Sequence, residues 1–245
     1  MPRDLADVLH LFAPELAGAE EPAPIPACVG VPIGSADRTA LALVRNLAVE
    51  TARQGARVSL LAPRALDVGA GSQPLLGVAT PAVADQPGAL VTGSERALRE
   101  APRFERAFVF AALPGVWLGK ASDVAPLLRW TLTLVRPDEA SLADAAYALD
   151  AIATTAPGAR LGVTVYGVRT VAEARDCFEH LALRSEQRLG RTLTSYGILV
   201  DDVRLSRSIV TGRPIPLASP HSGAARALAD VASLLLADAG TLRRE

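Results

Sequence analysis

The residues best placed for chemistry lie between an apolar run and a helical segment. Residues 34–39 read Gly-Ser-Ala-Asp-Arg-Thr and follow the apolar run 27–33. A loop between a strand and a helix binds phosphate when it is rich in glycine and carries Lys-Ser/Thr, because backbone N–H groups and an ammonium surround the anion. This loop has the position of such a site but not its residues. The candidates for a vestigial phosphate loop are Gly34, Ser35, Asp37, Arg38 and Thr39.

Lysine is nearly absent from the chain, and Lys120 is its only occurrence. No alignment of the loop can therefore supply the phosphate-binding lysine. Arg38-Thr39 is the best substitute, because a two-residue shift would put it at the Lys-Thr position and arginine binds phosphate well. That shift would turn the helix face by about 200° at roughly 3.6 residues per turn. Asp37 is predicted to cap the helix that begins near Arg38, and its charge would repel phosphate.

Apolar runs alternate with helical segments along the whole of residues 27–240. Strands are expected at 27–33, 56–62, 89–92, 106–112, 130–135, 160–166 and 195–200. The first helix is expected to begin near Arg38 and to be closed by Gly55, and further helices are expected at 94–101, 123–128, 141–154, 170–188, 201–210 and from 219 onward, with an irregular connection at 65–87. Ser141, Thr170, Asp201 and Ser219 are the predicted caps. Such alternation predicts a doubly wound, mostly parallel α/β sheet flanked by helices in three layers, a Rossmann-type arrangement.

The first 26 residues precede this pattern. Residues 1–13 are predicted to form a helix, residues 14–26 a proline-rich linker, and residues 27–240 one α/β domain. The helix carries an apolar stripe, which must be buried on its own domain or in a partner's groove. We favour a partner, because a linker of about a dozen residues is longer than packing on the domain requires. The predicted docking residues are Leu5, Val8, Leu9 and Phe12.

Composition argues against several classes of function. The net charge of −1 gives no reason to expect nucleic acid or an anionic membrane as the main partner. Cys28 and Cys177 lie far apart and are expected to be free thiols of a cytoplasmic protein. No signal peptide and no apolar run of about 18 residues is recognised. Three arginines recur at helical spacing: Arg184, Arg188 and Arg191. They are expected to form a solvated helix face or, alternatively, a contact patch for DNA or an acidic partner.

About residues 27–237 resemble the MinD/ParA superfamily of deviant-Walker P-loop ATPases, and within it the FlhG-like proteins. Asn46-Leu47-Ala48, Gly55 and the run 56–62 are similar to the family's NLA…G-x-R-V-x-L-L-D. Pro114-Gly115 resembles its second switch, and residues 135–149 resemble its V-x-x-P-E-x-x-S-x-x-D-A-Y segment. The resemblance implies a P-loop NTPase fold.

The departures from the family's pattern fall on the residues that do its chemistry. Aligned from Asn46, Ser35 replaces the signature lysine, Ala40 the P-loop lysine and Leu41 the Mg²⁺-binding threonine. The other replacements are Ala62 and Arg64 for aspartates after the second strand, Ala111 for the Walker B aspartate and Tyr166 for the base-contacting asparagine. Phosphoryl transfer needs Mg²⁺ and a cationic cradle. We therefore expect a degenerate nucleotide site with no catalytic residue, no metal and no cofactor.

These observations indicate a non-catalytic pseudo-ATPase that acts as an interaction or regulatory protein. The resemblance implies a role in polar, flagellar or cell-division positioning, with an active paralogue or a GTPase as partner. The alternatives are a divergent ATPase that binds ATP or ADP weakly through Arg38-Thr39, and a nucleotide sensor without hydrolysis. A homodimer should form independently of nucleotide, because Ser35 is too short and uncharged to reach a partner's phosphates.

Overall fold

The computed structural model describes residues 27–34, 37–66, 77–81, 83–101, 106–119 and 123–241. The predicted N-terminal helix, the linker and the stripe Leu5, Val8, Leu9 and Phe12 lie outside these residues, as does Ser35. No helix in the described part of the chain combines the length and the hydropathy needed to cross a lipid bilayer.

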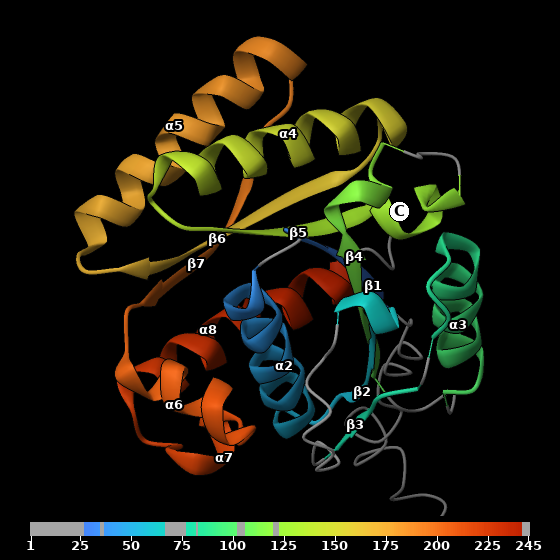
Figure 1. Ribbon diagram of the computed structural model, residues 1–245, viewed down its shortest axis with the longest axis vertical. Helices are drawn as coiled ribbons and strands as arrows, with labels where there is room; N and C mark the ends of the chain where they lie inside the picture. The colour runs from blue at the N-terminus through green and yellow to red at the C-terminus, as the bar shows by residue number, and fades with distance from the viewer. Residues whose placement is uncertain are drawn as a thin grey trace, which may run out of the picture.

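A seven-stranded parallel sheet forms the centre of the structure, in the order β3-β2-β4-β1-β5-β6-β7 (Figure 1). Its strands are β1 (Ala27–Ile33), β2 (Arg57–Leu61), β3 (Val78–Ala79), β4 (Ala107–Pro114), β5 (Trp130–Val135), β6 (Arg160–Val168) and β7 (Thr194–Val200). The predicted α/β architecture is thus confirmed. The central strands β1, β4 and β5 are almost wholly buried, which explains why they are continuous apolar runs.

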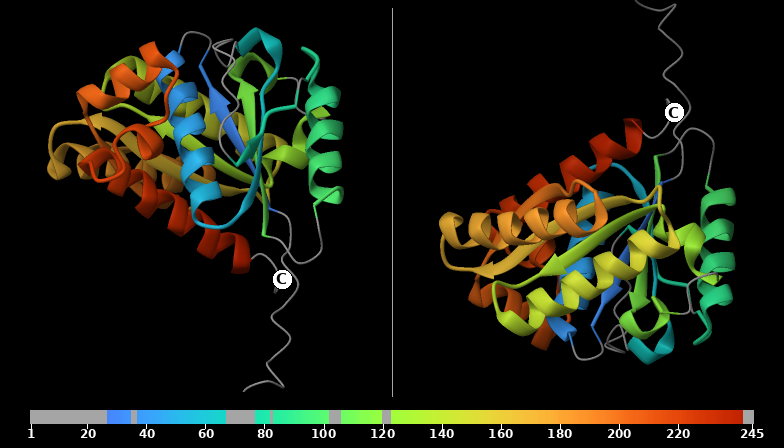
Figure 2. Two further views of the ribbon diagram at one scale, coloured as in Figure 1. Left: turned by 90° about the horizontal axis from the view of Figure 1, so that it is seen from below. Right: turned by 90° about the horizontal axis from the view of Figure 1, so that it is seen from above.

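Helices cover both faces of the sheet and make two hydrophobic cores (Figures 1 and 2). The helices are α2 (Arg38–Arg53), α3 (Pro87–Arg99), α4 (Glu139–Thr155), α5 (Val171–Leu189), α6 (Val203–Thr211), α7 (Ile215–Ala218) and α8 (Gly223–Thr241). Short 3-10 turns are η1 (Arg64–Leu66), η2 (Gly115–Trp117) and η4 (Ala125–Leu128). One core lies between the sheet and α2 and α8, and the other lies under α3, α4 and α5.

The region after β2 differs from the prediction. One continuous helix, α3, occupies Pro87–Arg99, where a strand at 89–92 and a separate helix were expected. Pro87 stands in the first helical turn, where its missing N–H costs nothing. Leu90, Gly93 and Ser94 are buried at helical spacing, so the short apolar run belongs to a helix face. The edge strand β3 lies instead in the connection that was expected to be irregular.

Three predicted helix starts are displaced. Asp138 rather than Ser141 caps α4, and its carboxylate accepts from the Ser141 N–H at 2.9 Å. Asp202, not Asp201, caps α6 by accepting from the Arg204 N–H. The last helix begins at Gly223 rather than after Ser219-Pro220. In each case a second good cap lies one to three residues from the predicted one, so local sequence does not separate them.

The cap of α5 is as predicted. Thr170 Oγ1 accepts from the Glu173 N–H at 3.1 Å, while the Glu173 carboxylate accepts from the Arg169 N–H. The carboxylate therefore reaches one residue further back than in a standard capping box.

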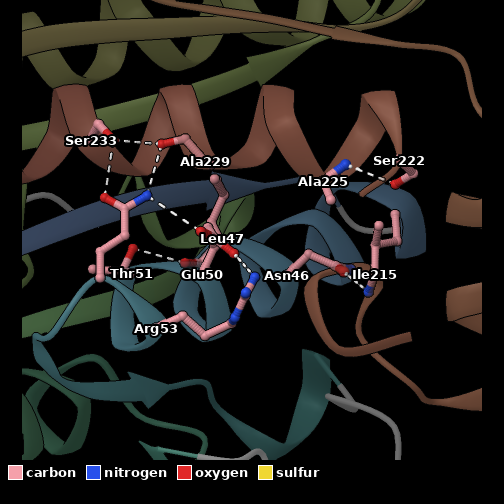
Figure 3. Close-up of polar contacts among 11 residues, drawn as sticks. Asn46, Leu47, Glu50, Thr51, Arg53, Ile215, Ser222, Ala225, Ala229 and Ser233 are labelled. Atoms are coloured by element: carbon pink, nitrogen blue, oxygen red, sulfur yellow. Dashed lines mark hydrogen bonds and ion pairs between the residues drawn. The ribbon is translucent and has the colours of Figure 1, made fainter. Parts of the chain in front are cut away.

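The side-chain amides of the buried Asn46 and the half-buried Gln54 hold α2 against the last third of the chain (Figure 3). The Ile215 N–H donates to Asn46 Oδ1 at 2.6 Å, and Asn46 Nδ2 donates to Ser208 Oγ at 3.3 Å. Further along α2, Gln54 Nε2 donates to the Ala229 carbonyl at 2.9 Å. These bonds fix α2 relative to α6, α7 and α8, and hence fix where the loop after β1 enters the helix.

A second hydrogen-bond network links β5, β7 and α8 on one side of the sheet. Trp130 Nε1 donates to the Tyr196 hydroxyl at 3.0 Å, which donates to Asp238 Oδ2 at 2.6 Å. Tyr196 is 2% exposed, and its ring lies over Gly162 of β6, where a side chain would have no room. The small residue at 162 is therefore part of how β6 and β7 pack.

Candidate functional site

A cleft of about 540 Å³ lies at the carboxyl ends of β1 and β5. In open parallel sheets this edge is where ligands usually bind. Of the residues predicted from the sequence, Gly34, Asp37, Arg38, Thr39 and Gly115 line the cleft. Pro114 ends β4 immediately before Gly115. The structure thus brings the described residues of the candidate loop and Gly115 together around one cavity.

Asp37 occupies the position at the start of α2 where a phosphate-binding loop would hold its anion. Its Oδ1 accepts from the Ala40 N–H at 2.8 Å, as predicted for a cap. Its Oδ2 accepts from the Tyr166 hydroxyl at 2.6 Å. The pKa of Tyr166 is raised above its usual range, by burial first and then by the bond to Asp37. A negative side chain of the chain itself thus satisfies the amide that an anion would use.

The residues aligned with the lysine and the threonine of a phosphate loop belong to the hydrophobic core. Ala40 and Leu41 are buried between α2 and the sheet. Arg38 is the first residue of α2, and its side chain is exposed beside the cleft. Residues 34–39 are the six residues that the motif G-x-x-x-x-G-K-[ST] places before its lysine, but α2 already begins at Arg38.

The helix α4 begins at the same cleft, through Ala140 and Ser141. Its N-terminus is capped by Asp138, which also forms an ion pair with Arg136 at 3.0 Å. Both helix N-termini at the cleft are therefore capped by the chain's own aspartates. The charged side chains among the lining residues balance, with Asp37 and Asp144 against Arg38 and Arg136. Such a lining is not the cationic environment that a triphosphate requires.

The positions aligned with magnesium-binding residues are also apolar or distant. Ala111 is fully buried in β4, between Gly30 of β1 and Leu61 of β2. Ala62 is buried and Arg64 lies in η1, and neither is among the residues that line the cleft. No group of three or more His, Cys, Asp or Glu side chains suited to a metal ion occurs in the described ranges.

Three residues at the cleft were not singled out from the sequence. Val116 and Tyr147 line it and are 70% and 61% exposed, so its rim is apolar. Thr133 also lines the cleft, and its buried hydroxyl has no hydrogen-bond partner within the described residues. Tyr147 and its neighbours occur in the segment that resembles the family's V-x-x-P-E-x-x-S-x-x-D-A-Y, which was the available signal.

Of the three arginines predicted at helical spacing, Arg184 and Arg188 lie on α5, whereas Arg191 follows the C-cap Gly190 and is outside the helix. Arg184 and Arg188 both form ion pairs with Asp150 of α4, at 3.2 and 3.3 Å. Arg191 donates to the Ala159 carbonyl. Part of the positive charge of these arginines is therefore offset by Asp150 within the fold.

Both cysteines are free, as expected. Burial raises the pKa of Cys28 to about 12 and, with help from Asp138 and Glu173, that of Cys177 to about 11. Burial, together with a bond to Asp238, also raises the pKa of Tyr196 above its usual range.

Stability should therefore fall on the alkaline side. Above about pH 9 an unfolded chain begins to release thiol and phenol protons that the folded chain still holds, so folding loses free energy as pH rises. We expect the urea midpoint to drop between pH 8 and pH 10.5. The Cys28→Ala variant should show a shallower drop than the parent. A midpoint that is flat or rises over this range would contradict the assignment.

No protein-family model and no curated protein sequence matches the chain. Solved structures do match it. MinD cell division protein of Aquifex aeolicus has a TM-score of 0.65 and 19% identity, over 86% of this chain and 97% of that one. The MinC:MinD cell division protein complex of Aquifex aeolicus matches with a TM-score of 0.60 and 16% identity, over 85% of this chain and 96% of that one. A ParA family ATPase from Chlorobium tepidum TLS matches with a TM-score of 0.56 and 13% identity, over 85% of this chain and 98% of that one. The chain therefore has the fold of the MinD and ParA P-loop ATPases, as the resemblance implied.

Proposed function

We propose that this chain is a non-catalytic protein of MinD/ParA-like fold that acts by binding other proteins. The observation that carries the proposal is the Asp37 carboxylate, held by the Ala40 N–H and the Tyr166 hydroxyl at the start of α2. A phosphate at this helix end would have to displace a bonded carboxylate of the same sign. Displacement would leave the buried Tyr166 hydroxyl without its acceptor.

The rest of the cleft supports the same proposal. Its charges balance, the lysine and threonine positions are the buried Ala40 and Leu41, and the Walker B position is the buried Ala111. Transfer of a phosphoryl group from Mg-ATP depends on positioned metal and cations. The side chains at these three positions offer neither.

A role in protein binding rests on exposed apolar residues and on the family. The rim residues Val116 and Tyr147 offer apolar surface beside the cleft. The stripe Leu5, Val8, Leu9 and Phe12 offers a second candidate surface in the undescribed N-terminal segment. One structurally similar protein is a MinC:MinD complex, so a protein of this fold assembles with another protein. The proposal places this chain in the cytoplasm, in cell-division, polar or flagellar positioning, with an active paralogue or a GTPase as partner.

A second candidate function is favoured by one observation. Arg38 is exposed at the first position of α2 and lines the cleft, where a guanidinium can contact a phosphate. A divergent ATPase or a nucleotide sensor would use this residue with Thr39.

Titration calorimetry with Mg-ATP and with Mg-free ADP tests the proposal. We expect no binding at nucleotide concentrations up to about 1 mM, which corresponds to a binding free energy weaker than about −4 kcal/mol. Light scattering of the same samples should give one mass with and without ATP. Micromolar Mg-ATP binding that Arg38→Ala abolishes and Arg64→Ala retains would establish the second candidate. Mg-free binding without phosphate release would indicate the sensor.

A further inference from the structure

The cleft at the carboxyl ends of β1 and β5 contains a buried hydroxyl that the fold does not satisfy. Thr133 of β5 lines the cleft and is 3% exposed. Its Oγ1 has no hydrogen-bond partner in the described part of the chain. Burying a hydroxyl without a partner lowers stability, so such groups are rare in folded proteins. An unsatisfied hydroxyl on the wall of a cleft therefore indicates a ligand with a polar group.

Two carboxylates converge on the same cleft beside Gly34. A Cβ built on this glycine would lie 3.8 Å from Asp144 Oδ2 and 3.8 Å from Asp37 Cβ. The Asp144 carboxylate makes no hydrogen bond and no ion pair with another residue in the described ranges. The Asp37 carboxylate accepts one bond at each oxygen, which leaves lone pairs free on both. The cleft thus offers hydrogen-bond acceptors that lack donors.

The charges around these acceptors leave an excess of negative charge. The Arg136 guanidinium is paired at 3.0 Å with Asp138, which is not a lining residue. Asp37 and Asp144 then face one remaining cation of the lining, Arg38. Arg38 is exposed at the first position of α2, where water screens its charge. A ligand with a single positive charge offsets this excess.

The rim of the cleft selects an apolar body for that ligand. Val116 and Tyr147 are 70% and 61% exposed beside the cavity, and Leu118, Ala145 and Ala148 also line it. A volume of about 540 Å³ accepts a short hydrocarbon chain or a single ring. A primary ammonium has three N–H donors and no acceptor, so it matches a site in which the free polar atoms are acceptors.

We infer that the cleft binds a primary ammonium carried on an apolar stem. The ammonium donates to the Asp144 carboxylate and to Thr133 Oγ1, with Asp37 facing it, and the stem packs on Val116 and Tyr147. A free amine and a lysine side chain on another protein both present this chemistry. The inference deepens the proposed function by naming what the cleft takes, and it rests on that function in that the cleft holds no nucleotide.

Titration of the ¹⁵N-labelled full-length chain tests the inference by nuclear magnetic resonance. Hexylamine, 1-hexanol and hexanoate share one apolar body and carry a positive, a zero and a negative charge. We expect hexylamine to shift the amide signals of Gly34 and Gly115, which line the cleft, with saturation at about millimolar concentration. 1-Hexanol should bind roughly tenfold more weakly, because it lacks charge-assisted hydrogen bonds, and hexanoate should not bind.

Three variants assign the binding to the named side chains. Asp144→Asn should weaken hexylamine binding roughly three- to tenfold. Thr133→Val keeps the shape without the hydroxyl and should weaken it roughly two- to fivefold, with no fall in melting temperature. The matched control Asp176→Asn changes an aspartate on α5 whose side chain is 72% exposed and which does not line the cleft, and should bind like the parent.

Three outcomes would each overturn the inference. These are equal affinity for the three six-carbon ligands, equal losses in Asp144→Asn and Asp176→Asn, and signal shifts confined to residues outside the cleft. Full hexylamine affinity in Thr133→Val would also contradict it, because the unsatisfied hydroxyl would then have no part in binding.

Two further titrations identify the source of the ammonium and separate the inference from the proposed function. Nα-acetyl-lysine methylamide presents the ammonium on a protein backbone. Binding at least as tight as that of hexylamine assigns the site to a lysine of another protein, and weaker binding assigns it to a free amine. Mg-ATP should not displace hexylamine. Displacement would refute the proposed function and leave the ammonium site standing, whereas absence of both hexylamine and Mg-ATP binding would refute the inference alone.

Discussion

Asp37→Ala is expected to lower the free energy of unfolding by roughly 2–4 kcal/mol, since it removes a helix cap and orphans a buried hydroxyl. Loss of the bond to the Ala40 N–H accounts for about 1 kcal/mol. Tyr166 is 1% exposed, and its hydroxyl would lose its acceptor. This loss accounts for the rest. In a chain of this length the melting temperature should fall by roughly 4–16 °C. Differential scanning calorimetry gives the value.

Two control variants separate these contributions. Asp37→Asn keeps an oxygen for the Ala40 N–H, and its Nδ2 can donate to the Tyr166 oxygen where Oδ2 accepted from it, so it should lose about 1 kcal/mol or less. Tyr166→Phe removes the hydroxyl, so Asp37→Ala in that background should cost only the cap. Equal losses for Asp37→Ala in both backgrounds would show that the bond between Asp37 and Tyr166 contributes nothing to stability.

The same variants examine the proposed function. We expect Asp37→Ala to remain unable to bind Mg-ATP, because the lysine, threonine and Walker B positions are still Ala40, Leu41 and Ala111. Micromolar Mg-ATP binding by Asp37→Ala would instead show that this carboxylate alone prevents binding.

Gly162→Ala is expected to destabilise the chain by roughly 2–4 kcal/mol through overpacking. A Cβ at this position would lie 2.4 Å from Cε2 of Tyr196 and 2.8 Å from the Thr131 carbonyl oxygen. The carbonyl belongs to the backbone of β5, and the ring is held by bonds to Trp130 and Asp238. Moving the ring would break its bonds to Trp130 and Asp238, and moving the carbonyl would displace the backbone of β5. Urea denaturation measures the effect.

Gly158→Ala is the matched control, since a Cβ there would meet nothing within 4 Å and the glycine has no positive φ. It should be neutral or slightly stabilising. Tyr196→Leu should reduce the cost of Gly162→Ala by removing the ring. A loss for Gly162→Ala as small as for Gly158→Ala would mean that β6 and β7 are not packed as described.

The sequence by itself determined six of the seven strands, all but the edge strand β3, and the main helices. Continuous apolar runs such as those of β4 and β5 are characteristic of buried parallel strands, and Asp37 and Thr170 are caps that act on residues three positions away. The absence of a phosphate-loop lysine also followed from the sequence, because a chain whose only lysine is Lys120 cannot place one near residue 40 in any alignment.

Tertiary structure alone decided which residues meet at the start of α2. Asp37 and Tyr166 lie 129 residues apart, and they meet because the strand order sets the end of β6 near the start of α2. The continuity of α3 depends on burial of Leu90, Gly93 and Ser94 against its neighbours, which a short apolar run does not reveal. The contact between α2 and α6 includes a bond from Asn46 to Ser208, which lies 162 residues away. Local sequence encodes periodicity and caps, whereas each of these contacts depends on which elements the folded chain places side by side.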